Sequence, residues 1–106
     1  MLYLKQDEIA LIFYRWLTRR VKRINEPTKF ICALCTEPGF GKYLHVCTDT
    51  AIPQNCIIIR EFEVEDSNHI PDIKLIKDGI EKHWQILSEI KRSDYENELN
   101  EAKGNT

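Results

Sequence analysis

Two stretches of helical periodicity enclose a central segment with a different pattern, and this contrast constrains the fold more than any other feature. The central segment, Phe30 to Val64, contains all four cysteines and most of the residues that favour strands. Residues 2 to 24 before it and 73 to 101 after it repeat their apolar residues every three or four positions, as an amphipathic helix does. We therefore expect a helix at each end of the chain and strands between them.

Three short runs inside the central segment have the character of strands. They cover residues 29 to 35, 42 to 48 and 56 to 65, and a turn with Pro38 and two glycines separates the first two. The third run begins with consecutive isoleucines, a pattern typical of a central strand. The sequence predicts an α+β fold: an N-terminal helix, a three-stranded antiparallel meander over 29–65 and a C-terminal helix.

The length and composition of the chain suit one packed domain. Its 106 residues have the size of a single domain, so 1–106 is predicted to form one unit. Apolar residues make up 42% and charged residues 30%, which favours a core over disorder. The longest apolar run, Ile9 to Tyr14, is far shorter than the roughly 20 residues that span a bilayer. We expect a cytoplasmic protein without a membrane partner.

The cysteines form the only candidate metal site. Cys32 and Cys35 have the C-x-x-C spacing with which a tight turn directs two thiolates at one tetrahedral ion. Cys47 and Cys56 complete a set of four, and His45 is the alternative ligand in place of Cys47. Zinc is the cofactor that these ligands predict.

Strand periodicity conflicts with that zinc site. Positions 32 and 35 of a regular strand point to opposite faces, because side chains alternate with period two. Zinc binding therefore requires the first strand to end by Cys32 and to curl into a knuckle. Two further arrangements remain open: free thiols packed as small apolar side chains, and a disulfide or redox pair.

Charge of each sign gathers in a separate part of the chain. One arc of the first helix is basic, and under the alternative hypothesis this arc contacts nucleic-acid phosphates. The end of the third strand is acidic and is the candidate protein-binding surface. The formal net charge of -2 argues against a general polyanion binder. The basic residues are Arg15, Arg19, Lys22 and Arg23, and the acidic residues are Glu61, Glu63 and Glu65.

These features rank three hypotheses about function. The first is a small non-enzymatic protein-interaction module, an adaptor or inhibitor, which structural zinc would stabilise if the cysteine site forms. The second is a nucleic-acid-binding module that uses the basic face of the N-terminal helix. The third is a small zinc-dependent enzyme. A homodimer is an alternative to a separate protein partner, because both helices carry more apolar surface than three short strands cover.

Overall fold

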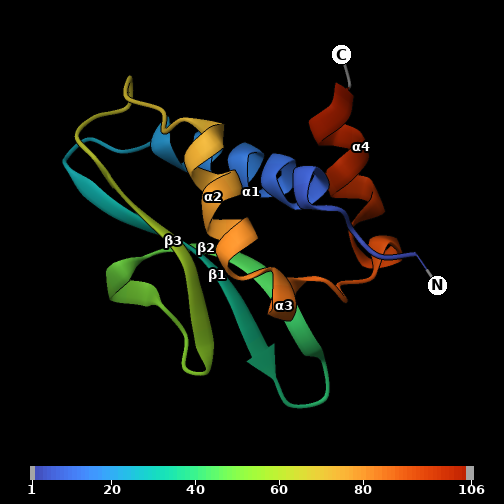
Figure 1. The fold of residues 1–106 in the computed structure, drawn as a ribbon. Coiled ribbons are helices and arrows are strands. Elements are labelled where there is room, and N and C mark those ends of the chain that lie inside the picture. The colour runs from blue at the N-terminus through green and yellow to red at the C-terminus, as the bar shows by residue number, and fades with distance from the viewer. Residues whose placement is uncertain (1, 105–106) are drawn as a thin grey trace.

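A three-stranded antiparallel sheet carries helices on one face (Figure 1). The computed structural model describes residues 2–104. Helical structure precedes and follows three antiparallel strands, so the predicted α+β fold class is confirmed. The elements follow in the order α1 (Gln6–Val21), β1 (Thr28–Glu37), β2 (Gly41–Thr48), 3-10 helix η1 (Asp49–Ala51), β3 (Cys56–Val64), α2 (Ile73–Lys82), α3 (Trp84–Leu87), 3-10 helix η2 (Arg92–Tyr95) and α4 (Glu96–Gly104).

The first helix is shorter than the predicted helix over residues 2 to 24. Its apolar stripe is buried, with no exposed surface at Phe13. The residues ahead of the helix are extended, and the Leu4 N–H donates to the carbonyl oxygen of Ile90 at 2.9 Å. The helix ends at Val21. The N-terminal segment therefore pairs with the C-terminal part of the chain instead of adding a turn to α1.

β1 is the central strand of the sheet, which has the order β2-β1-β3. A meander would place the strands in chain order. All residues of β1 from Phe30 to Cys35 are buried, as expected for a strand covered on both faces. The isoleucines of β3 lie at an edge instead, where Ile57 and Ile58 are 45% and 39% exposed. Both β1 and β3 contain a continuous apolar run, and β1 occupies the central position of the sheet.

A β-bulge decides which residues of β3 face the helices. The register with β1 shifts between Cys32 and Ala33, and Ile59 is the extra residue in β3. One extra residue reverses the alternation of side chains beyond it. Cys56, at the start of β3, consequently lies opposite Cys35 on the face away from the helices.

α2 crosses β3 closely at Gly79, next to this bulge. A Cβ atom at Gly79 would lie 2.6 Å from the carbonyl oxygen of Ile59, closer than such atoms approach in proteins. The helix continues through Gly79 to Lys82. Gly79 therefore permits close packing of α2 on the sheet.

The predicted helix over residues 73 to 101 is divided into α2, α3, η2 and α4. Between α3 and η2 the chain pairs with the N-terminal segment: Tyr3 forms an antiparallel bridge with Lys91, and the Arg92 N–H donates to the Leu2 carbonyl oxygen at 3.1 Å. This pairing uses backbone groups that a continuous helix would bond internally. The apolar residues of the predicted stripe still enter the core, and the buried ones are Ile76, Ile80, Leu87, Ile90 and Leu99.

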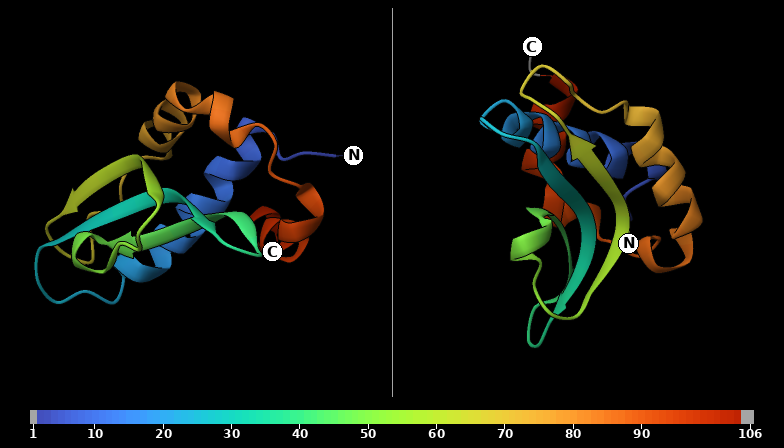
Figure 2. Two further views of the ribbon diagram at one scale, coloured as in Figure 1. Left: turned by 90° about the horizontal axis from the view of Figure 1, so that it is seen from below. Right: turned by 90° about the vertical axis from the view of Figure 1, so that its left-hand side faces the viewer.

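The two faces of the sheet carry separate apolar clusters. Alternate residues of β1, including Phe30 and Leu34, join the core that α1 and α2 cover. Figure 2 shows the sheet from below, with its strands in front of α1. The far face carries a smaller cluster formed by Ile31, Ala33, Cys35 and Cys47. Ile52, which follows η1, packs against that smaller cluster.

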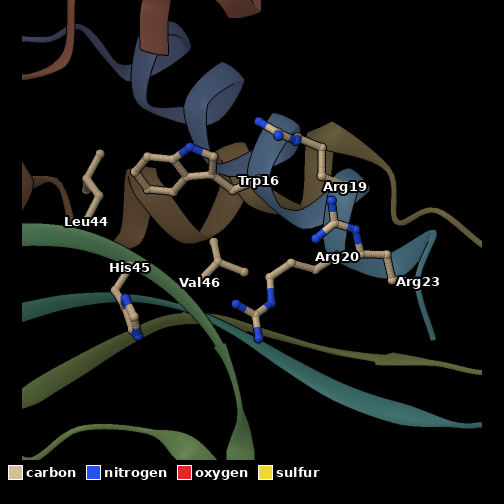
Figure 3. A pocket seen from close by; sticks show the side chains of 7 residues that line it. All are labelled: Trp16, Arg19, Arg20, Arg23, Leu44, His45 and Val46. Carbon is tan, nitrogen blue, oxygen red and sulfur yellow. The ribbon is translucent and has the colours of Figure 1, made fainter. Parts of the chain in front are cut away.

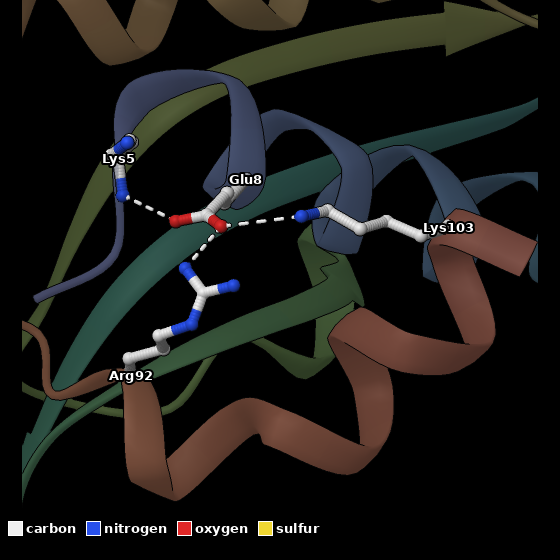
Figure 4. A network of polar contacts seen from close by, with 4 residues as sticks. All are labelled: Lys5, Glu8, Arg92 and Lys103. Carbon is white, nitrogen blue, oxygen red and sulfur yellow. Dashed lines mark hydrogen bonds and ion pairs between the residues drawn. The ribbon is translucent and has the colours of Figure 1, made fainter.

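A buried carboxylate joins the start of α1 to the C-terminal segment (Figure 4). The Glu8 carboxylate accepts hydrogen bonds from the Lys5 N–H at 2.9 Å and from Arg92, and Lys103 lies 3.5 Å away. Burial opposes ionisation of Glu8, but these donors outweigh it and hold the pKa of the carboxyl below its usual value. The contacts keep α4 beside α1.

Candidate functional site

The second half of α1 presents a stripe of residues toward β2. Positions 16, 19 and 20 share one side of α1 because of its 3.6-residue period, and position 23 follows in the turn just after the helix. Three of these four residues are arginines. Together with three consecutive residues of β2 they line a pocket of about 360 Å³, here named the arginine pocket (Figure 3): Trp16, Arg19, Arg20, Arg23, Leu44, His45 and Val46.

The arginine pocket is bordered by three guanidinium groups and by no carboxylate. Among residues 2–104, the side chains of Arg19, Arg20 and Arg23 form neither an ion pair nor a hydrogen bond. Clustered charges of one sign repel one another, and an anion placed between them removes that repulsion. The planar guanidinium also matches the oxygen pairs of carboxylate and phosphate groups. The chemistry of this pocket therefore favours an anionic ligand.

Arg20 connects the pocket to the far face of the sheet. His45 and Cys47 both point to that face, and the positive charge of Arg20 acts on each of them. Burial, and then Arg20, lowers the pKa of His45, whereas burial raises the pKa of the Cys47 thiol and Arg20 partly offsets this effect. Arg20 belongs to the same basic run of the sequence as the four predicted residues, and its position four residues after Trp16 places it on the β2 side of α1.

The four residues predicted to contact nucleic acid lie on two sides of α1. Arg19 and Arg23 line the arginine pocket. Arg15 and Lys22 line a second hollow of about 280 Å³ that extends toward α4, and Arg19 borders this hollow too. Arg15 forms an ion pair with Glu101 at 3.2 Å. The predicted set is thus only partly brought together, and one of its charges has an acidic partner on α4.

The four predicted zinc ligands are not gathered at one point. Cys35 and Cys56 form a disulfide between β1 and β3, while Cys32 and Cys47 are free and buried. β1 continues regularly past Cys35, so Cys32 points to the helix side of the sheet, where burial raises the pKa of its thiol to about 12. No three His, Cys, Asp or Glu side chains within residues 2–104 are placed to hold a metal ion. Structural zinc, with His45 as the alternative ligand, stays a prediction.

The predicted acidic surface lies on the outer part of β3. Glu61 pairs with Lys29 across the strands at 2.9 Å. Glu63 and Glu65 are exposed and border a hollow of about 240 Å³ that Lys29 also lines. A protein-binding role for these three carboxylates remains a prediction, with one of them already partnered by a lysine.

Within residues 2–104, no helix combines the length and the apolar character that crossing a bilayer requires. Comparison of the chain with protein-family models, with curated protein sequences and with solved structures gives no significant match. What the protein binds has to follow from the chemistry of its own surface, and the arginine pocket is the described feature with the most definite chemistry.

Proposed function

We propose that this protein is a protein-interaction module, an adaptor or inhibitor, whose arginine pocket holds a carboxylate-bearing part of its partner. The observation that carries the proposal is the gathering of Arg19, Arg20 and Arg23 around one pocket without an acidic partner. Arginine is enriched at protein interfaces, where its apolar stem packs and its head pairs with carboxylates. Trp16, which is only partly buried, supplies the apolar part of such a contact.

Nucleic acid is the second candidate ligand, because the additional cations Arg15 and Lys22 extend the positive surface of α1. Two observations favour a protein. The net charge of the chain is -2, and the exposed glutamates of β3 would repel a long polyanion. Trp16 packs against Tyr95 with ring centroids 6.3 Å apart, so it belongs to the core more than to a platform for stacked bases.

The proposal is tested by comparing two charge reversals on neighbouring positions of α1. Arg20→Glu places a carboxylate in the arginine pocket, whereas Lys22→Glu makes the same change of charge on the α4 side. The partner captured from the native lysate should be a protein that nuclease treatment leaves in place. We expect Arg20→Glu to weaken its retention by about tenfold or more, because a like charge replaces an attractive one, and Lys22→Glu to change retention little.

Two results would overturn the proposal. One is retention that disappears on nuclease treatment, which identifies nucleic acid as the ligand. The other is an equal loss for Arg20→Glu and Lys22→Glu, which shows that net charge matters and the pocket does not. Circular dichroism of both variants confirms that each remains folded before binding is compared.

A further inference from the structure

β2 is an edge strand, so one side of its backbone has no neighbouring strand. The Leu44 N–H donates to the hydroxyl of Tyr95 at 2.8 Å, which shows that this N–H points away from β1. In an antiparallel pair, the backbone groups of alternate residues point toward the partner strand and those between them point away. Val46, two residues beyond Leu44, therefore also directs its N–H and C=O away from β1.

These outward backbone groups lie beside the arginine pocket, because Val46 is one of the residues that line it. Tyr95 covers the strand edge at Leu44. No hydrogen bond to the Val46 N–H from outside the sheet is formed within residues 2–104. A strand edge with free donors and acceptors is a template for an added strand.

We propose that the partner contributes an extended acidic segment, which adds to β2 as a fourth strand at Val46 and places its carboxylates among Arg19, Arg20 and Arg23. This inference rests on the proposed function and specifies the form of the partner. A peptide strand offers an acceptor for the Val46 N–H and a donor for its C=O. A phosphodiester backbone offers acceptors alone, so the strand edge favours a peptide over nucleic acid.

The alternation of side chains predicts the sequence of the segment. Successive residues of an added strand point to opposite faces of the sheet. Toward the helix side, an acidic residue would meet Arg19 of α1 and Arg23 in the turn that follows the helix. Toward the far side, its neighbour would meet Arg20, whose charge already acts on His45 there. Two consecutive acidic residues would therefore meet cations on both faces, whereas acidic residues at alternate positions would meet them on one.

A synthetic peptide tests the inference on the intact protein. The probe is a capped hexapeptide, Val-Thr-Glu-Glu-Thr-Val, and its counterpart carries Gln in place of both Glu residues. We expect the acidic probe to bind about tenfold or more tightly than the Gln peptide, because charge-assisted bonds are lost in the latter. Amide hydrogen exchange should slow about tenfold at Val46 when the probe binds. The Leu44 amide, already bonded to Tyr95, is the internal control and should change little.

Backbone N-methylation separates strand pairing from simple charge attraction. Two versions of the probe carry N-methyl groups on alternate residues, one set on the amides that would face β2 and the other on the amides that would face away. We expect the version methylated on the amides that face β2 to lose binding, because it lacks the donors to the strand edge. The version methylated on the amides that face away should still bind. Equal binding by both, with Val46 exchange unchanged, would overturn the added strand while leaving an acid-binding pocket and the proposed function intact.

Two other occupants of the edge give distinct results. If a second copy of this chain fills it, Val46 exchange slows with increasing protein concentration in the absence of any peptide, and the inference fails. If a single-stranded oligonucleotide displaces the probe and binds more tightly than it, both the inference and the proposed function fail. The variant Arg20→Glu should abolish the preference for the acidic probe over the Gln peptide.

Discussion

On the side of the sheet that carries α1 and α2, side chains from strands and helices interlock in one core, whereas the far side carries a small cluster beside η1 and a disulfide. Leu34 and Ile31, three residues apart on β1, are each only 2% exposed, yet they belong to different clusters. The helix side is stabilised by apolar packing. Residues on the far side have fewer apolar neighbours, and the disulfide between β1 and β3 adds to the stability of that side.

This difference bears on the arginine pocket, which lies at the strand edge where the two sides meet. Arg19 and Arg23 belong to the helix side, while Arg20 reaches the residues of the far side. A partner bound at this edge would contact both. The main core holds α1 in place, and the disulfide lies on the far side.

The largest effect is expected from truncating matched side chains on the two sides. Leu34→Ala should lower the free energy of unfolding by about 4 kcal/mol and Ile31→Ala by about 2 kcal/mol, because a closed core relaxes less around a cavity than a cluster bordered by a short loop. Urea denaturation measures both values. Equal losses for the two variants would show that the far cluster is as firmly packed as the main core.

Reducing the disulfide on the far side should lower the free energy of unfolding by about 3 kcal/mol, the value expected for a bond that closes a loop of this length. Reductant should therefore lower the melting temperature of the wild-type protein by roughly 12 °C and leave the double variant Cys35→Ser with Cys56→Ser unchanged. Thiol titration after denaturation should find two free thiols, those of Cys32 and Cys47. Four free thiols together with bound zinc would instead support the metal site predicted from the C-x-x-C spacing.

The smallest of the three effects concerns the polar contacts that reinforce the helix side. Glu8→Gln keeps the shape of the side chain but removes the charge that Arg92 and Lys103 face, at a cost of about 2 kcal/mol. The pKa of Glu8 is lower in the folded than in the unfolded state. The stabilisation is therefore fully present at pH values above the pKa of Glu8 in the unfolded state. It is lost as the pH falls through the pKa of Glu8 in the folded state. Unfolding curves at several pH values should show wild type and variant converging in acid.

Periodicity predicted most of the secondary structure and part of the site. The spacing of apolar residues in α1 and the alternation in β2 reflect contacts that each element makes along its whole length, so a local pattern suffices to find them. The interruption of the C-terminal helix had no such signal, because it depends on pairing between Tyr3 and Lys91, far apart in the chain. The sequence shows the basic run that contains Arg20, but which of its cations face β2 depends on how α1 packs on the sheet.

The sequence by itself determined the helix–strands–helix order, because this order follows from repeats of a few residues along the backbone. It left open whether Cys32 and Cys35 share an ion or point to opposite faces of a regular strand. Only the tertiary structure decided the partner of Cys35. An alternation counted back from Phe62 places Cys56 on the helix side, and the bulge at Ile59 turns it to the far side. The bulge lies where α2 packs closely on β3 at Gly79, a contact between distant segments that no local pattern records.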